Sequence, residues 1–161
     1  MTRPLAALLA LLLAGCAAAP RHPDAFTFAV LGDTPYSDAE EREYLAMLAR
    51  ISRESVDFVI HVGDFKGGGD CSDALYARVR AQFDSVAHPL VYTPGDNEWT
   101  DCRRPYMGSF DPLERLGRLR EVFFAEPRSL GASTLPTAMQ ERCETPPPQG
   151  CGCAYPENRR W

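Results

Sequence analysis

Three short apolar segments of this chain each end in a Gly-Asp pair. They are residues 26–31 before Gly32-Asp33, residues 56–62 before Gly63-Asp64, and residues 89–94 before Gly95-Asp96. Successive Asp residues are separated by roughly thirty residues, which is the length of a strand, a crossover helix and the next strand. Because such crossovers are right-handed and make neighbouring strands parallel, the three strand ends should lie at one edge of one sheet. The pattern predicts an α/β fold with a β-α-β-α-β core.

Apolar residues at helical spacing predict three helices. Ser37-Asp38-Ala39-Glu40 has the S-x-x-E form of a capping box and precedes the first apolar stripe. Cys71-Ser72-Asp73 opens a second helix. Asp111-Pro112 is typical of an N-cap followed by Pro at the first helical position, and the third helix is expected over residues 113–124.

The N-terminus has the features of an export signal. Arg3 precedes a Leu/Ala run that is too short to span a bilayer, and the run closes in Leu13-Ala14-Gly15-Cys16, which resembles the bacterial lipobox. This predicts a lipoprotein-type signal peptide over residues 1–15, lipidation of Cys16 and a tether over residues 16–25. An ordinary cleaved signal peptide is the alternative.

Composition agrees with one globular domain. The chain has 161 residues, 45% of them apolar, and the core is expected over residues 26–126. Residues 127–161 hold six of the 14 prolines and lack apolar periodicity, so an irregular Pro/Cys-rich segment is expected there. The net charge is −5 without a clustered basic block, which argues against a nucleic-acid-binding surface.

Export would place the five cysteines after Cys16 in an oxidising space, and an odd number cannot all pair within one chain. Cys71 and Cys102 each follow a Gly-Asp pair by a few residues, so both are expected in loops above the same sheet edge. We predict a disulfide between them. The pairing of Cys143, Cys151 and Cys153 stays open, and a zinc site at the last two lacks a second Cys pair and a nearby His.

Asp33, Asp64 and Asp96 would converge at the carboxyl edge of the sheet, where open α/β sheets hold their ligands. Carboxylates that lie close together repel each other unless a cation sits among them. A single Gly-Asp pair after a strand can instead make a turn or cap a helix. Its recurrence at three matching positions favours a site for a hard or borderline divalent cation.

The order Gly-Asp, His-x-Gly-Asp and Pro-Gly-Asp-Asn-Glu resembles the calcineurin-like metallophosphoesterases. The strings at residues 32–36, 95–102 and 156–161 are similar to one bacterial secreted branch of that family. The resemblance spans residues 26–126, and residues 156–161 form a second, separate segment of similarity. It implies a two-layer β sandwich flanked by helices, with a two-metal centre above the strand ends that hydrolyses phosphomonoesters or phosphodiesters.

The resemblance implies two divalent metal ions (Mn, Fe, Zn or Mg). Asp33 matches the Asp that binds the first metal, and Asp64 matches the Asp that bridges both. Asp96-Asn97 falls where the family has Asn-His, so Asp96 can be the ligand, or Asn97 after a shift of one residue. Asn97 stands at the position of the family's His and cannot act as a general acid near neutral pH. Pro35 replaces a further His ligand.

The family's later His ligands have no counterpart in this sequence, so the resemblance implies the N-terminal part of the sandwich, truncated at the C-terminus. The three His residues are not substitutes for them. His22 falls in the tether, His88 begins a strand away from the site, and alternation points His61 to the face opposite Asp64. We expect His61 to be a packing or supporting residue.

Cationic side chains follow the second and third Gly-Asp pairs. Lys66, Arg103 and Arg104 are candidates for binding phosphate oxygens, with solvated loop charges as the alternative. Gly67-Gly68-Gly69 lacks the Lys-Ser/Thr ending of a P-loop, which argues against a nucleotide site of that kind.

The sequence thus predicts an exported phosphoesterase, periplasmic or associated with the outer membrane, whose membrane contact is its lipid anchor and whose partner is a small phosphate ester. The alternative is a non-catalytic exported lipoprotein that keeps the scaffold as a binding or degenerate module. The missing His ligands favour the alternative, and the set of motifs favours the enzyme.

Overall fold

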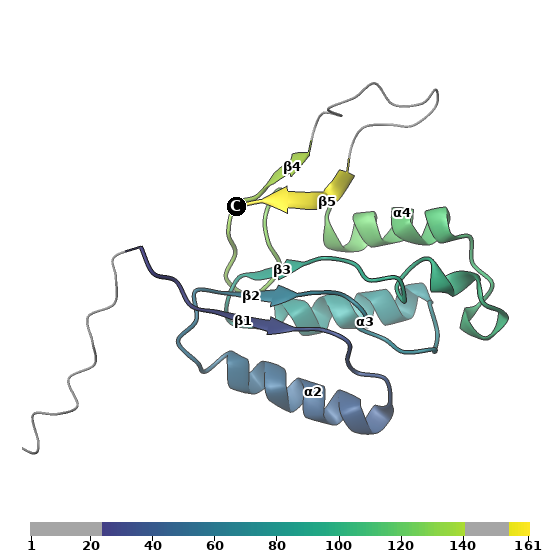
Figure 1. Cartoon of the computed structure of the whole chain (residues 1–161), viewed down its shortest axis with the longest axis horizontal. Helices are drawn as coiled ribbons and strands as arrows, with labels where there is room; N and C mark the ends of the chain where they lie inside the picture. Colours follow the sequence, from purple (N-terminus) through teal and green to yellow (C-terminus); the bar gives the residue numbers. More distant parts are fainter. Residues whose placement is uncertain (1–23, 141–154) are drawn as a thin grey trace, which may run out of the picture.

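A parallel three-stranded sheet forms the centre of the molecule, in a computed structural model that describes residues 24–140 and 155–161. The strands follow the order β1-β2-β3, with β1 at Phe28–Leu31, β2 at Phe58–His61 and β3 at Leu90–Tyr92. Their arrowheads point the same way, so the three strand ends share one edge of the sheet (Figure 1). The predicted α/β fold with a β-α-β-α-β core is confirmed.

Helices follow the strands as the capping patterns predict. They are α2 (Asp38–Ile51), α3 (Asp73–Asp84) and α4 (Pro112–Phe123). Ser37 accepts the N–H of Glu40 at the start of α2, and Ser72 accepts that of Leu75 at the start of α3. Asp111 accepts two backbone N–H groups at the start of α4, and Pro112 takes the first helical position.

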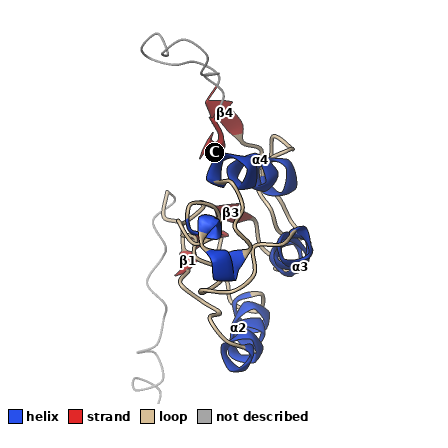
Figure 2. Ribbon diagram, turned by 90° about the vertical axis from the view of Figure 1, so that its right-hand side faces the viewer, coloured by secondary structure: helices blue, strands red, loops and turns tan. Residues whose placement is uncertain are grey.

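One face of the sheet packs against the helices, and the other stays open. Helices α2 and α3 lie on the same side of the sheet, and α4 packs beside α3 (Figure 2). The strand residues that point toward the helices are buried, and they are Leu31, Val59, His61, Leu90 and Tyr92. On the opposite face Phe28 is 44% exposed and Val30 is 56% exposed. Within the described residues, the three-stranded sheet is thus a single layer over the helices.

Part of the segment expected to be irregular, residues 127–161, forms a strand pair. Strand β4 (Ala138–Gln140) pairs antiparallel with β5 (Tyr155–Arg160). Arg120 on α4 binds Glu157 on β5 through two hydrogen bonds of 2.6 and 2.9 Å. Neither strand shows the apolar alternation from which it could be predicted.

Several predictions concern residues outside the described ranges. They are the signal peptide over residues 1–15, lipidation of Cys16, most of the tether, and the positions of His22, Cys143, Cys151 and Cys153. In residues 24–140 and 155–161, no helix is both long and apolar enough to cross a membrane.

Candidate functional site

Each Gly-Asp pair forms a turn at the carboxyl edge of the sheet. The Asp33 N–H donates to the Gly63 carbonyl at 3.1 Å, so the first turn is joined to the second. Both Asp33 and Asp64 have positive φ values, 57° and 53°. Asp tolerates this left-handed conformation better than most residues because its short polar side chain can hydrogen-bond locally.

The glycines allow the second and third turns to approach closely. A Cβ added to Gly63 would lie 2.2 Å from the Gly95 nitrogen, and Gly63 also has a φ of 94°. A Cβ added to Gly95 would lie 2.0 Å from Oδ1 of Asp64. Because any side chain at either position would overlap the neighbouring turn, glycine is required before both acidic residues.

Two carboxylates lie at the adjoining first and second turns. The Tyr36 hydroxyl donates to Oδ1 of Asp33 at 3.3 Å, and the Asn97 N–H donates to Oδ1 of Asp64 at 3.2 Å. Partial burial, followed by the negative charges of Asp33 and Asp64, raises the pKa of Tyr36 to about 12. The Tyr36 hydroxyl thus binds the carboxylate of Asp33, whose turn is joined to that of Asp64.

The third predicted carboxylate has a different environment. Asp96 is exposed, and its backbone carbonyl accepts the N–H groups of Trp99 and Asp101 and the hydroxyl of Thr100. The backbone position of Asp96 is thus fixed by hydrogen bonds from the loop that follows it. The half-buried Asn97 approaches Asp64 through its backbone.

The donor set of the site consists of oxygen atoms. Among the described residues, no three or more His, Cys, Asp or Glu side chains are arranged to hold a metal ion, so the expected cluster of three carboxylates is not formed there. Mg²⁺-type ions are commonly held by only one or two carboxylates together with waters and phosphate oxygens. Asp33 and Asp64 fit that kind of site.

Glu98 is a site residue that the sequence analysis did not single out. It is 0% exposed, and its Oε1 accepts the Phe65 N–H at 2.7 Å. Burial raises the pKa of Glu98 to about 7, although the hydrogen bond from Phe65 opposes that shift. The motif Pro-Gly-Asp-Asn-Glu contains this residue, but a charged side chain one position after Asn97 gives no sign that it will be buried.

A disulfide fixes the loop above the site. Cys71 and Cys102 are joined with a Cα–Cα distance of 5.8 Å, and both are fully buried. The bond connects the start of α3 to the short helix η2 (Asp101–Arg103). The Cys102 sulfur lies 3.7 Å from the Asn97 carbonyl oxygen. The structure thus confirms the predicted disulfide and places it directly beside the third turn.

The comparison with known families agrees with this geometry. A family model for calcineurin-like phosphoesterases matches residues 26–139. The chain belongs to this family. The match covers the three strands, the three helices and every Gly-Asp turn. No curated protein and no solved structure gives a significant match.

Lys66, a candidate for binding phosphate oxygens, is buried behind the glycine loop. It is only 4% exposed, and its Nζ donates to the carbonyls of Gly67 and Gly69 at 2.9 and 3.2 Å. Burial lowers the pKa of Lys66, and the negative charge of Glu98 is the largest effect opposing that shift. The ammonium group stabilises the glycine loop in this conformation.

The two candidate arginines lie at the surface of the same loop region. Arg103 is exposed at the end of η2. Arg104 pairs with Asp101 at 2.9 Å and donates to the Tyr106 hydroxyl at 3.0 Å. Both side chains are therefore accessible from solvent.

His61 lies beneath the site on the helix-covered face, as expected. Its Nδ1 accepts the Gly63 N–H at 3.2 Å, and its ring packs against Tyr44, Phe83 and Tyr92. Burial lowers the pKa of His61 to about 4. The imidazole is thus neutral near pH 7 and supports the second turn from below.

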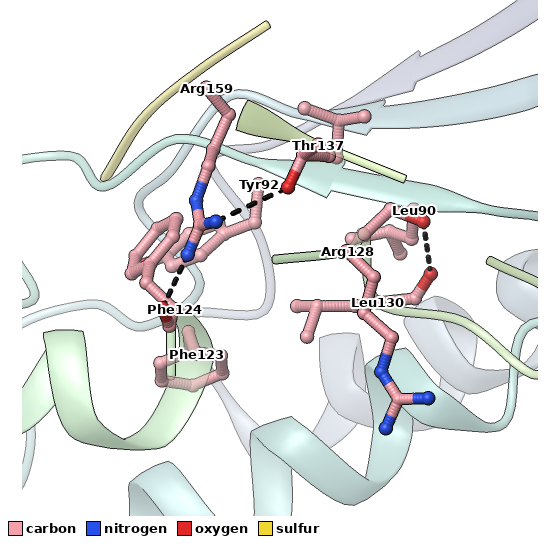
Figure 3. Close-up of a pocket in the computed structure, with 10 residues that line it drawn as sticks. Leu90, Tyr92, Phe123, Phe124, Arg128, Leu130, Thr137 and Arg159 are labelled. Carbon is pink, nitrogen blue, oxygen red and sulfur yellow. Dashed lines mark hydrogen bonds between the residues drawn. The ribbon is translucent and has the colours of Figure 1, made fainter. Parts of the chain in front are cut away.

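A small cavity of about 20 Å³ lies away from the Gly-Asp turns, between β3, the end of α4 and β5 (Figure 3). Arg159 crosses it and donates to the Thr137 hydroxyl at 3.2 Å and to the Phe124 carbonyl. A volume of this size holds about one water molecule, which is too little for a phosphate ester.

Proposed function

We propose that this member of the calcineurin-like phosphoesterase family is a metal-dependent hydrolase of small phosphomonoesters or phosphodiesters. One observation carries the proposal. The first two Gly-Asp turns, joined by the hydrogen bond from the Asp33 N–H to the Gly63 carbonyl, carry the carboxylates of Asp33 and Asp64 at the carboxyl edge of a parallel sheet. Ligands of open α/β sheets bind at this edge.

The residues of the chain have distinct roles in this proposal. Asp33 and Asp64 supply oxygen ligands, and Asp96 or Asn97 supplies a further ligand from the third turn. Two divalent ions held by these residues would supply polarisation of the phosphoryl group and an activated water molecule. Arg103 and Arg104 bind the phosphate oxygens as cations at the rim of the site. Lys66 adds positive charge from behind the glycine loop.

Turnover is expected to be slow. Asn97 has no proton to transfer near neutral pH, so the leaving group must take its proton from water. General acid catalysis contributes typically about 10²–10⁴-fold to such reactions. Esters with good leaving groups, such as aryl phosphates, should therefore be the best substrates.

We also propose that the protein belongs to the bacterial secreted branch of the family. It would then be exported, and either periplasmic or associated with the outer membrane. Two features support this. Leu13-Ala14-Gly15-Cys16 resembles a lipobox, with Cys16 as the lipid-modified residue and the only membrane contact. The Cys71–Cys102 disulfide is typical of an oxidising compartment.

A non-catalytic exported lipoprotein is the second candidate. It is favoured by Pro35 and Asn97, which stand at two positions where the family has His. In that case the same site would bind a phosphate ester without cleaving it.

Hydrolysis of p-nitrophenyl phosphate and bis-p-nitrophenyl phosphate by the full chain, with Mn²⁺, Mg²⁺ or Zn²⁺, tests the proposal. We expect metal-dependent hydrolysis that falls at least about 100-fold in Asp64→Asn, since a proposed carboxylate ligand is lost. Glu54→Gln, which changes an exposed carboxylate at the far end of α2, should keep full activity. Hydrolysis that persists without metal or in Asp64→Asn contradicts the enzyme. Metal binding without hydrolysis supports the second candidate.

A further inference from the structure

Glu98 makes a direct connection between the third turn and the second. Its carboxylate is 0% exposed and accepts the N–H of Phe65 at 2.7 Å. Phe65 is the residue immediately after Asp64. The second carboxylate oxygen of Glu98 is buried and has no hydrogen-bond partner within the described residues. The Phe65 bond is therefore the main hydrogen-bonding contact of this side chain.

The position of that N–H group determines its importance. The Phe65 N–H belongs to the peptide plane whose orientation is set by the ψ angle of Asp64. Asp64 has a φ of 53°, in the left-handed region that residues other than glycine adopt less readily. Such a conformation persists only where surrounding contacts determine it. A buried acceptor for the Phe65 N–H is a contact of this kind.

A second contact acts on the side chain of Asp64. The N–H of Asn97 donates to Oδ1 of Asp64 at 3.2 Å. Two adjacent residues of the third turn thus restrain Asp64. Asn97 binds the Asp64 carboxylate, and Glu98 binds the peptide group between Asp64 and Phe65. Together they restrict both the backbone and the side chain of this one acidic residue.

Glu98 is itself held in place from the core. The Tyr76 hydroxyl donates to the Glu98 carbonyl at 2.5 Å, and Tyr76 is fully buried on α3. The Cys71–Cys102 disulfide lies beside the Asn97 carbonyl. The third turn is therefore a firmly supported part of the molecule, able to impose its geometry on the second.

We propose that Glu98 is a positioning residue, whose buried carboxylate fixes Asp64 in the conformation that binds metal. It acts through the Phe65 peptide group, without touching metal or substrate. The assignment rests on the proposed function in so far as Asp64 is taken as a metal ligand. The hydrogen bond to Phe65 and its effect on the turn are independent of that function.

Two substitutions separate the hydrogen bond from the charge. Glu98→Gln keeps an oxygen that can accept the Phe65 N–H, whereas Glu98→Leu removes the acceptor and keeps a similar volume. Glu41→Leu is the matched control, because the Glu41 carboxylate also accepts a hydrogen bond, from the side-chain amide of Gln82 at 2.9 Å, but is remote from Phe65 along the chain. The readouts are amide exchange of Phe65 in the metal-free full chain, measured by NMR, and Mn²⁺ affinity.

We expect Glu98→Leu to speed exchange of the Phe65 amide about tenfold or more and to weaken Mn²⁺ binding about 10–100-fold. Glu98→Gln and Glu41→Leu should stay within about threefold of the wild type in both readouts. If Glu98→Leu does not fold, Glu98→Gln decides. A folded Glu98→Gln variant that loses Mn²⁺ affinity overturns the proposal, because it keeps the acceptor for the Phe65 N–H and loses only the charge. Values like those of the wild type in both readouts support the proposal.

Unchanged Mn²⁺ affinity in a folded Glu98→Leu variant also overturns the proposal. If the wild type itself binds no Mn²⁺, the proposed function fails, and so does the role of Glu98 in metal binding. Phe65 exchange then reports separately whether Glu98 fixes the turn. Failure of the function and failure of the hydrogen-bond argument are thus distinguishable.

Discussion

At the scale of single residues, the carboxyl edge depends on ionisable side chains kept out of water. His61, Lys66 and Glu98 are all buried, and each makes a hydrogen bond to the backbone of the second turn or of the glycine loop after it. Burial costs free energy for charged groups, so these contacts must offset a desolvation penalty. We infer that their common role is to set the backbone around Asp64.

The pH dependence of stability tests the buried state of His61. Its folded-state pKa of about 4 lies below the ordinary value of 6.5, so the unfolded chain takes up a proton more readily. The contribution of the neutral His61 to the free energy of unfolding is therefore fully present above pH 6.5. It is lost as the pH falls toward 4, which lowers the free energy of unfolding by about 3 kcal/mol. The side chain of His61→Asn does not titrate, and its oxygen can replace Nδ1 as acceptor for the Gly63 N–H.

Urea unfolding of both proteins between pH 4 and 7.5 measures this difference. We expect the wild type to lose stability relative to His61→Asn as the pH falls. Other titrating groups, including Glu98, affect both proteins alike and cancel in the comparison. Parallel pH profiles for the two proteins would contradict a buried neutral His61.

At the scale of elements, the loop between β3 and α4 is held by a disulfide and by polar contacts in addition to its apolar packing. The disulfide connects it to the start of α3, and Tyr76 on α3 binds it at Glu98. Arg115 on α4 donates to the carbonyl of Cys71, which is the loop's disulfide partner, at 3.0 Å. The guanidinium of Arg115 also lies 4.3 Å from the centre of the Phe110 ring. The functional loop is therefore attached to two helices.

Removal of the disulfide tests this attachment. The bond joins Cys71 to Cys102, which are 31 residues apart in the sequence. Closing a loop of that length in the unfolded chain is worth about 3–4 kcal/mol. We expect the double variant Cys71→Ala, Cys102→Ala to lose that amount in free energy of unfolding, measured by urea titration. Wild-type protein assayed in strong reductant should approach the variant, and equal midpoints for oxidised wild type and variant would show that the bond adds nothing.

At the scale of the whole molecule, the sheet is covered on one face only within the described residues. Rings of Phe28 and Phe58 stack at 5.3 Å on the open face, and Trp161 meets Phe58 edge-on at 6.0 Å. Parallel sheets usually have both faces covered, so an open face of this kind is unusual. Its apolar residues contribute less to stability than those beneath the helices.

The same substitution on the two faces measures that difference. Val30 on β1 is 56% exposed, whereas Val59 on β2 is 0% exposed. We expect Val30→Thr to change the free energy of unfolding by less than about 1 kcal/mol, and Val59→Thr to cost about 2–3 kcal/mol because its hydroxyl is buried. Thermal or urea unfolding of both variants compares them. Similar losses at the two positions would show that the open face is covered in solution.

Much of the fold is predictable from the sequence because its signals are local. Strand, cap and helix signals lie within a few residues of one another, and the expected segments 26–31, 56–62 and 89–94 contain β1, β2 and β3. The Gly-Asp recurrence also places Asp33 and Asp64 at adjoining turns, since a crossover helix makes consecutive strands parallel.

The tertiary structure alone decided the properties that depend on contacts between distant segments. Glu98 and Lys66 are charged residues in loops, and only the approach of Gly63 to Gly95 and the packing of the short helices bury them. The pairing of β4 with β5 depends on partners such as Arg120 and Glu157. Whether Asp96 joins Asp33 and Asp64 is decided in the same way, because the conformation of the loop after Asp96 leaves this residue exposed. Burial and side-chain direction result from packing between segments some thirty residues apart, and no local pattern contains that information.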